Sequence, residues 1–150
     1  MKETHMVRLT GLLVVNNEVL IIEQKVGGRS WYLPGGKLEK GETLEEGIIR
    51  EMREETGALV EVERMVCIAD SHFKNPAALH ILFQLKLCGG EIGVQENNYE
   101  SVPITNVKFV PISSLTEYGF SRKFAEACAE EMKNIPIYVG KDTYFDLENF

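Results

Sequence analysis

The sequence has few of the features that mark secreted, zinc-binding or membrane proteins. It contains only three cysteines in 150 residues, Cys67, Cys88 and Cys128, and no two of them form a C-x-x-C pair. This spacing excludes a disulfide framework and the common zinc patterns. No apolar run approaches the ~20 residues that a membrane-spanning helix needs, and the first ten residues lack the apolar core of a signal peptide. We therefore expect a cytoplasmic protein with reduced thiols and no membrane partner.

Several catalytic motifs are also absent. Lys37 follows Gly36 but precedes Leu38 rather than the serine or threonine of a phosphate-binding P-loop. The sequence contains no H-E-x-x-H zinc motif and no G-x-S-x-G nucleophile elbow. Positive charge is scarce as well, since 16 lysines and arginines stand against 23 acidic residues, for a formal net charge of -7. Because DNA and RNA backbones need neutralising cations, a long nucleic acid is not expected as a partner.

The pattern of hydrophobic residues predicts a mixture of strands and helices. With 44% hydrophobic residues, the chain suits a single domain over 1–150. Apolar or alternating segments separated by turn signals such as Asn16-Asn17 are typical of β-strands. This order of elements predicts an α/β or α+β fold with helices packed on a mixed sheet, and the aromatic tail 135–150 suggests a terminal hairpin. The expected strands are 7–15, 18–24, 59–68, 81–87 and 107–110, and the expected helices are 43–57 and 121–133.

The segment 35–58 carries the strongest functional signal. Its helix begins with the capping-box pattern of Thr43 and Glu46 and ends at Gly57. At about 100° per residue, one arc of this helix is apolar and should face the sheet, and a neighbouring arc gathers three carboxylates around the small Gly47. The apolar arc contains Leu44, Ile48, Ile49 and Met52, the acidic arc contains Glu51, Glu54 and Glu55, and the remaining face contains Glu46, Arg50 and Arg53.

The acidic arc indicates a metal and phosphate site. Carboxylates at this spacing repel one another, and a divalent cation removes that cost. Carboxylate oxygen suits Mg²⁺, Mn²⁺ or Ca²⁺, and Mg²⁺ commonly shares its coordination shell with substrate phosphates. The alternative is an ordinary solvated helix face with scattered salt bridges. That alternative does not account for the Pro34-Gly35-Gly36 loop before the helix, for Glu42 at the end of the loop or for Gly57 behind the helix.

The same segment resembles the Nudix box, Gly-x5-Glu-x7-Arg-Glu-U-x-Glu-Glu-x-Gly-U, in which U is a bulky aliphatic residue. The box spans 36–58, and only its last position departs from the pattern, because Ala58 is small. Segments 31–36 and 106–112 also resemble the family, so the resemblance covers most of 7–133 and leaves the tail 135–150 unassigned. It implies an α/β/α sandwich with a mixed central sheet. The matching residues are Gly36, Glu42, Arg50, Glu51, Met52, Glu54, Glu55 and Gly57.

The resemblance also implies roles for individual residues, with Mg²⁺ or Mn²⁺ as the cofactor. Arg50 would orient the glutamates, and Glu51 or Glu54 would act as the general base, with Glu54 preferred. A later loop is expected to add one more acidic ligand, with Glu96 and Glu100 as the candidates. The residues implied as metal ligands are Glu51, Glu54, Glu55, the carbonyl of Gly35 and Glu42.

The reaction implied is hydrolysis of a nucleoside diphosphate linked to another moiety, by attack of water on a phosphorus. The family acts on nucleoside triphosphates, nucleotide sugars and ADP-ribose, and we rank a nucleoside triphosphate or nucleotide sugar first. The candidates for substrate contact are Trp31, Lys37 and Glu100. Trp31 would stack on a base, with packing against the core as its alternative role. By analogy with the family, a homodimer is expected.

Three other functions are also compatible with this sequence. The first is a nucleotide-sensing Nudix module without catalysis, although the chain keeps every glutamate of the box. The second is an RNA 5′-end pyrophosphohydrolase, which the acidic charge balance disfavours. The third is a box that binds Ca²⁺ for structure alone, which predicts stabilisation by metal without turnover.

Overall fold

The computed structural model describes residues 4–26, 29–72, 76–96 and 102–141. Within these residues the chain forms eight strands, two α-helices and one short 3-10 helix, η1. In chain order the elements are β1 (Met6–Val15), β2 (Glu18–Val26), β3 (Arg29–Tyr32), β4 (Gly35–Lys37), α1 (Leu44–Thr56), β5 (Ala58–Ser71), β6 (Ala78–Gly90), β7 (Asn106–Pro111), η1 (Ile112–Tyr118), α2 (Arg122–Ala129) and β8 (Tyr138–Lys141).

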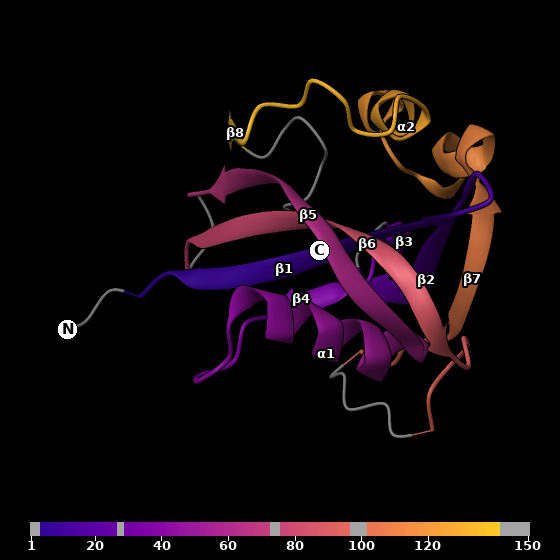
Figure 1. The fold of residues 1–150 in the computed structure, drawn as a ribbon, viewed down its shortest axis with the longest axis horizontal. Helices are drawn as coiled ribbons and strands as arrows, with labels where there is room; N and C mark the ends of the chain where they lie inside the picture. Colours follow the sequence, from indigo (N-terminus) through magenta and orange to yellow (C-terminus); the bar gives the residue numbers. More distant parts are fainter. Residues whose placement is uncertain (1–3, 27–28, 73–75, 97–101, 142–150) are drawn as a thin grey trace.

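The strands form one mixed sheet in the order β3-β2-β1-β6-β5-β8, with β4 beside β1 and β7 beside β2. β1 runs parallel to β6 and β5 runs parallel to β8, whereas the other pairs are antiparallel. In Figure 1, α1 covers one side of the sheet, and α2 and η1 cover the other. The predicted mixed sheet between helical layers is therefore confirmed.

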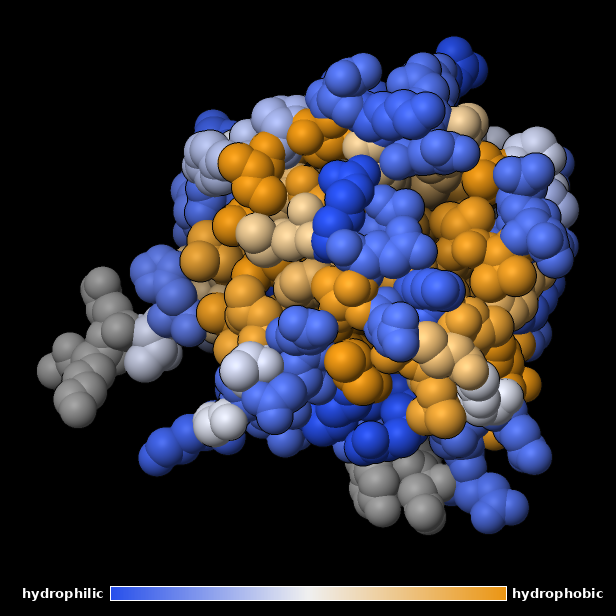
Figure 2. Space-filling model, in the orientation of Figure 1, coloured by the Kyte–Doolittle hydropathy of each residue, from blue (hydrophilic) through white to orange (hydrophobic). Residues whose placement is uncertain are grey.

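Alternation of side chains along β1 divides the core into two layers. Leu9 and Leu13, both fully buried, pack in the layer that contains Ile48 and Met52 of α1. Leu12 points to the opposite face, into the layer that contains Phe124 of α2. The apolar arc predicted for the first helix thus faces the sheet. Figure 2 shows hydrophobic residues gathered over the strands in the middle of the view and hydrophilic residues along the lower edge, where α1 lies in Figure 1.

The local signals for the first hairpin and the first helix are confirmed. Asn16 and Asn17 both adopt positive φ, 52° and 62°, in the tight turn that joins β1 to β2. Thr43 caps α1 through a bond from the Glu46 amide, and the Glu46 carboxylate accepts the Thr43 amide in return, which completes the capping box. Gly57 ends the helix with φ of 79°.

β5, β6 and α2 differ from the sequence prediction at their ends. β5 and β6 extend beyond the predicted 59–68 and 81–87, because their antiparallel pairing continues to Ser71 and Ala78. The second helix is shorter than the predicted 121–133 and ends at Ala129. Within the described residues, neither α-helix is long and apolar enough to span a bilayer.

The early end of α2 has a local cause. Glu131, Met132 and Asn134 adopt positive φ, which breaks the helical pattern. Arg64 of β5 donates to the carbonyl of Met132 at 2.9 Å and so holds this turn on the sheet. Met132 is still only 1% exposed, so the predicted buried stripe persists beyond the helix itself. Of the predicted terminal hairpin, β8 is present as a partner of β5, and residues 142–150 lie outside the described residues.

Candidate active site

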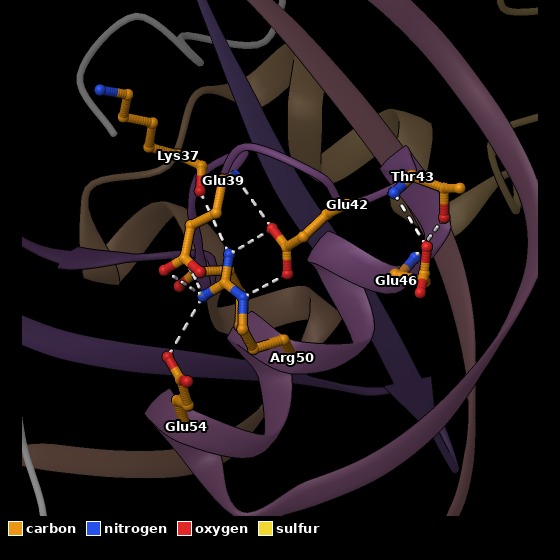
Figure 3. A network of polar contacts seen from close by, with 8 residues as sticks. Lys37, Glu39, Glu42, Thr43, Glu46, Arg50 and Glu54 are labelled. Atoms are coloured by element: carbon orange, nitrogen blue, oxygen red, sulfur yellow. Dashed lines mark hydrogen bonds and ion pairs between the residues drawn. The ribbon is translucent and has the colours of Figure 1, made fainter.

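Arg50 is the centre of a carboxylate cluster between α1 and the loop that precedes it (Figure 3). Its Nε and Nη2 donate to the two carboxylate oxygens of Glu42 at 2.6 and 2.9 Å. Its Nη1 donates to Glu51 at 2.9 Å and to Glu54 at 3.2 Å. Its Nη2 also reaches the carbonyl of Lys37 at 3.3 Å. One guanidinium therefore joins the loop, β4 and two turns of the helix.

The charges of this cluster stabilise one another. The Arg50 side chain is only 14% exposed, and the hydrogen bond to Glu42 raises the pKa of its guanidinium. The same hydrogen bond from Arg50 lowers the pKa of Glu42 from 4.5 to about 2, with help from the amide of Glu39. Both groups are therefore charged at neutral pH. The sequence placed Arg50 on the face away from the acidic arc, but its long side chain turns back onto that arc.

Glu51 and Glu55 lie under the glycine loop and are 6% and 4% exposed. The amide of Gly35 donates to Oε1 of Glu55 at 2.7 Å. A side chain at Gly36 would place its Cβ 2.6 Å from Oε1 of Glu51, which explains why glycine stands there. Glu51 and Glu55 thus lie against Gly36 and Gly35, at the start of the predicted box.

The acidic arc is divided between buried and exposed positions. Glu54 points outward with 41% of its side chain exposed, unlike Glu51 and Glu55. Gly47, which the sequence places in the acidic arc, lies against β1, because a Cβ there would lie 2.6 Å from Leu9. Gly47 thus allows α1 to pack closely on β1. In the described part of the chain, no three histidine, cysteine or acidic side chains converge as a preformed metal site.

A groove of about 620 Å³ adjoins the exposed side of this cluster. It is lined by Arg53 and Glu54 of α1 and by residues 91–96, which follow β6. Glu96 therefore shares a groove with Glu54, and its role as a later acidic ligand stays a prediction. The other candidate, Glu100, lies outside the described residues.

The segment that follows β6 is fixed to the end of α1 by backbone contacts, which the sequence did not indicate. The amide of Gly93 donates to the carbonyl of Thr56 at 2.9 Å. A Cβ at Gly90 would lie 2.1 Å from the carbonyl of Gly57, and one at Gly57 would lie 2.0 Å from the carbonyl of Glu91. Both glycines have positive φ, at 93° and 79°. The only sequence signal for this contact is the pair of glycines at the ends of the two elements.

Comparison with known proteins agrees with this geometry. The NUDIX domain family matches residues 5–128 of the chain. The chain belongs to the Nudix family. This membership makes it a Nudix-type hydrolase, an enzyme class that acts on phosphorus-containing anhydrides.

Three relatives illustrate the similarity. An ADP-ribose pyrophosphatase of Methanocaldococcus jannaschii is 29% identical over 78% of this chain and 68% of its own length. A MutT-like protein of Streptomyces ambofaciens is 34% identical over 83% of this chain and 73% of its own length. The crystal structure of a UDP-X diphosphatase superposes with a TM-score of 0.63 and 28% identity, and the match covers 75% of this chain and 54% of that one.

The Nudix family generally uses a divalent metal, and the residues present fit one. The donors gathered by the Nudix helix and its loop are carboxylate oxygens, the ligands that Mg²⁺ and Mn²⁺ prefer. Arg50 donates hydrogen bonds to three of these carboxylates, those of Glu42, Glu51 and Glu54, and also pairs with Glu39 at 3.6 Å. A cation that recruits them must therefore compete with this guanidinium.

The side chains of two residues predicted to contact substrate do not reach the Nudix carboxylates. Trp31 packs edge-on against Tyr118 at 5.3 Å, with the ammonium of Lys108 4.9 Å from its ring, in the core layer opposite α1. Lys37 contributes its carbonyl to Arg50, while its ammonium points away from the cluster (Figure 3). Packing is thus the role that the described contacts give to Trp31.

Proposed function

We propose that this Nudix hydrolase is a metal-dependent pyrophosphohydrolase for a nucleoside diphosphate linked to another moiety, such as ADP-ribose or a nucleotide sugar. The observation that carries the proposal is the Arg50-centred carboxylate cluster beside the groove that Glu54 lines. The similarity to an ADP-ribose pyrophosphatase and to a UDP-X diphosphatase supports this substrate class over a nucleoside triphosphate.

In the proposed reaction, a water oxygen attacks one phosphorus of the diphosphate and the bridging P–O bond breaks. Glu54 is the proposed general base, because it is more exposed than Glu51, the other helix carboxylate bound to Arg50, and its bond to Arg50 is longer, at 3.2 Å against 2.9 Å. Glu54 takes the proton of the attacking water, and the leaving phosphate keeps the bridging oxygen. When bound, Mg²⁺ or Mn²⁺ would neutralise phosphoryl charge and lower the pKa of water.

The remaining residues position this chemistry. The proposed metal ligands are the carbonyl of Gly35 and the carboxylates of Glu42, Glu51, Glu54 and Glu55. Arg50 holds Glu42 and Glu51 in place and so preorganises the site. We also propose that the chain acts as a single Nudix domain in the cytoplasm. We further propose that it forms a homodimer, which light scattering of the purified protein tests.

The direct test is a substrate panel with Mg²⁺, Mn²⁺ and an EDTA control. ADP-ribose, nucleotide sugars, nucleoside triphosphates and dinucleoside polyphosphates are incubated with the protein, and the nucleotide products are separated by chromatography. Metal-dependent release of a nucleoside monophosphate from ADP-ribose or a nucleotide sugar is the expected result. Tight binding of one compound without turnover of any would refute catalysis and indicate a nucleotide sensor.

A further inference from the structure

The two arginines of α1 behave differently. Arg50 is half-buried among the glutamates and donates to three of them. Arg53 lies in the last turn of the helix and is exposed. Its guanidinium forms no hydrogen bond or ion pair with the described part of the chain, although Glu54 is adjacent and Glu91 and Glu96 line the same groove. A cation that stays unpaired beside three carboxylates is available to an anionic ligand.

The size of the groove and the charges of the residues that line it favour a role for Arg53 in binding an anionic ligand. Its volume of about 620 Å³ lies within the range of ligand-binding pockets. Arg53 is the single cation among the described residues that line it. The carboxylates repel a phosphate, so a phosphate in the groove depends on Arg53 for direct attraction to the protein. The planar guanidinium suits this task because its N–H groups pair with two phosphate oxygens at once.

We propose that Arg53 is a substrate-binding residue, whose guanidinium binds non-bridging oxygens of the substrate diphosphate in this groove. The inference rests on the proposed function, since it takes a nucleoside diphosphate group as the ligand. Arg53 then determines how tightly the diphosphate is held next to Glu54, whereas bond cleavage depends on the carboxylate cluster. Nothing in the Nudix box itself requires arginine at this position, because the box leaves it open.

Steady-state kinetics with Mg²⁺ tests whether Arg53 contributes to substrate binding rather than to bond cleavage. For Arg53→Gln we expect KM to rise about tenfold or more, the loss that follows removal of a charged hydrogen bond, with kcat changed by less than about threefold. Arg53→Lys should recover only part of the affinity, because an ammonium lacks the fork. Arg122→Gln is the matched control, since it removes one exposed positive charge at the start of α2. A fall in kcat with unchanged KM in Arg53→Gln would overturn the inference.

Equilibrium binding separates this inference from the proposed function. The α,β-methylene analogues of ADP and UDP carry a P–C–P bridge that water does not cleave as an anhydride. Calorimetry with Mg²⁺ should give a Kd about tenfold higher for Arg53→Gln than for the wild type and the Arg122→Gln control. Such binding without turnover of any substrate would refute the proposed function and leave the inference standing. Equal Kd values for wild type and Arg53→Gln, or no binding by the wild type, would overturn the inference.

Discussion

Replacing Arg50 by glutamine removes the cation on which the carboxylate cluster depends. The side chain makes four hydrogen bonds to carboxylates, two to Glu42 and one each to Glu51 and Glu54. In Arg50→Gln these carboxylates lose their counter-charge while Glu51 stays buried. The neutral amide also cannot make the paired bonds to Glu42.

The structure sets the size of the effect. Breaking a fully buried ion pair by removing one partner costs about 3–5 kcal/mol. The pairs of Arg50 should fall at the lower end of this range, because 15% of the Glu42 side chain and 41% of the Glu54 side chain are exposed. We therefore expect Arg50→Gln to lower the free energy of unfolding by about 3 kcal/mol. For a chain of this length, that corresponds to a fall in Tm of about 6–12 °C.

Urea and thermal unfolding in EDTA measure this loss, with Arg122→Gln as a control for the removal of one positive charge. A double-mutant cycle with Glu42→Gln should show strong coupling, because the two residues share a pair of hydrogen bonds. Adding Mg²⁺ should raise the Tm of Arg50→Gln more than that of the wild type, since the cation then meets no competing guanidinium. An unfolding free energy within about 1 kcal/mol of the wild type in EDTA, together with no coupling, would refute the reasoning.

Three further predictions concern the glutamates. The guanidinium lowers the pKa of Glu42 from 4.5 to about 2, so its stabilising contribution is complete above pH 4.5 and is lost as pH falls toward 2. Glu42→Gln should flatten acid unfolding curves in that window, and unchanged curves would contradict this. Glu54→Gln should lower kcat by ~100-fold or more, with near-normal turnover as the contrary result. Gly36→Ala should reduce kcat by about tenfold or more by displacing Glu51, whereas Gly89→Ala, with no contact closer than 4.0 Å, should not.

Local signals in the sequence predicted the helix of the Nudix box well, because its ends and its faces are determined by nearby residues. The capping box at Thr43 and the left-handed Gly57 fix the two ends. The spacing of Ile48 and Met52 fixes the buried face, since burial of apolar surface dominates helix orientation. These features place Glu51 against the loop without further long-range information.

The parts that the sequence did not predict depend on contacts between distant segments. The role of Arg50 was implied by the family resemblance but not by the helical wheel, because a wheel takes no account of the length of a side chain. The turn after α2 is held by Arg64, which is more than sixty residues away in the chain. The approach of residues 91–96 to Thr56 uses backbone groups, which any residue type supplies and no pattern of side chains reveals.

The backbone contact between the end of α1 and the start of the segment 91–96 allows the two walls of the groove to change independently in evolution. Gly57 and Gly90 meet through main-chain atoms, so this contact does not depend on the side chains of the residues that follow Gly90. Substitutions in the groove wall beyond this contact, at Val94 for example, should therefore leave the position of Glu54 unchanged. Substrate preference can therefore drift at one wall of the groove while the hydrolytic apparatus at the other wall keeps its geometry.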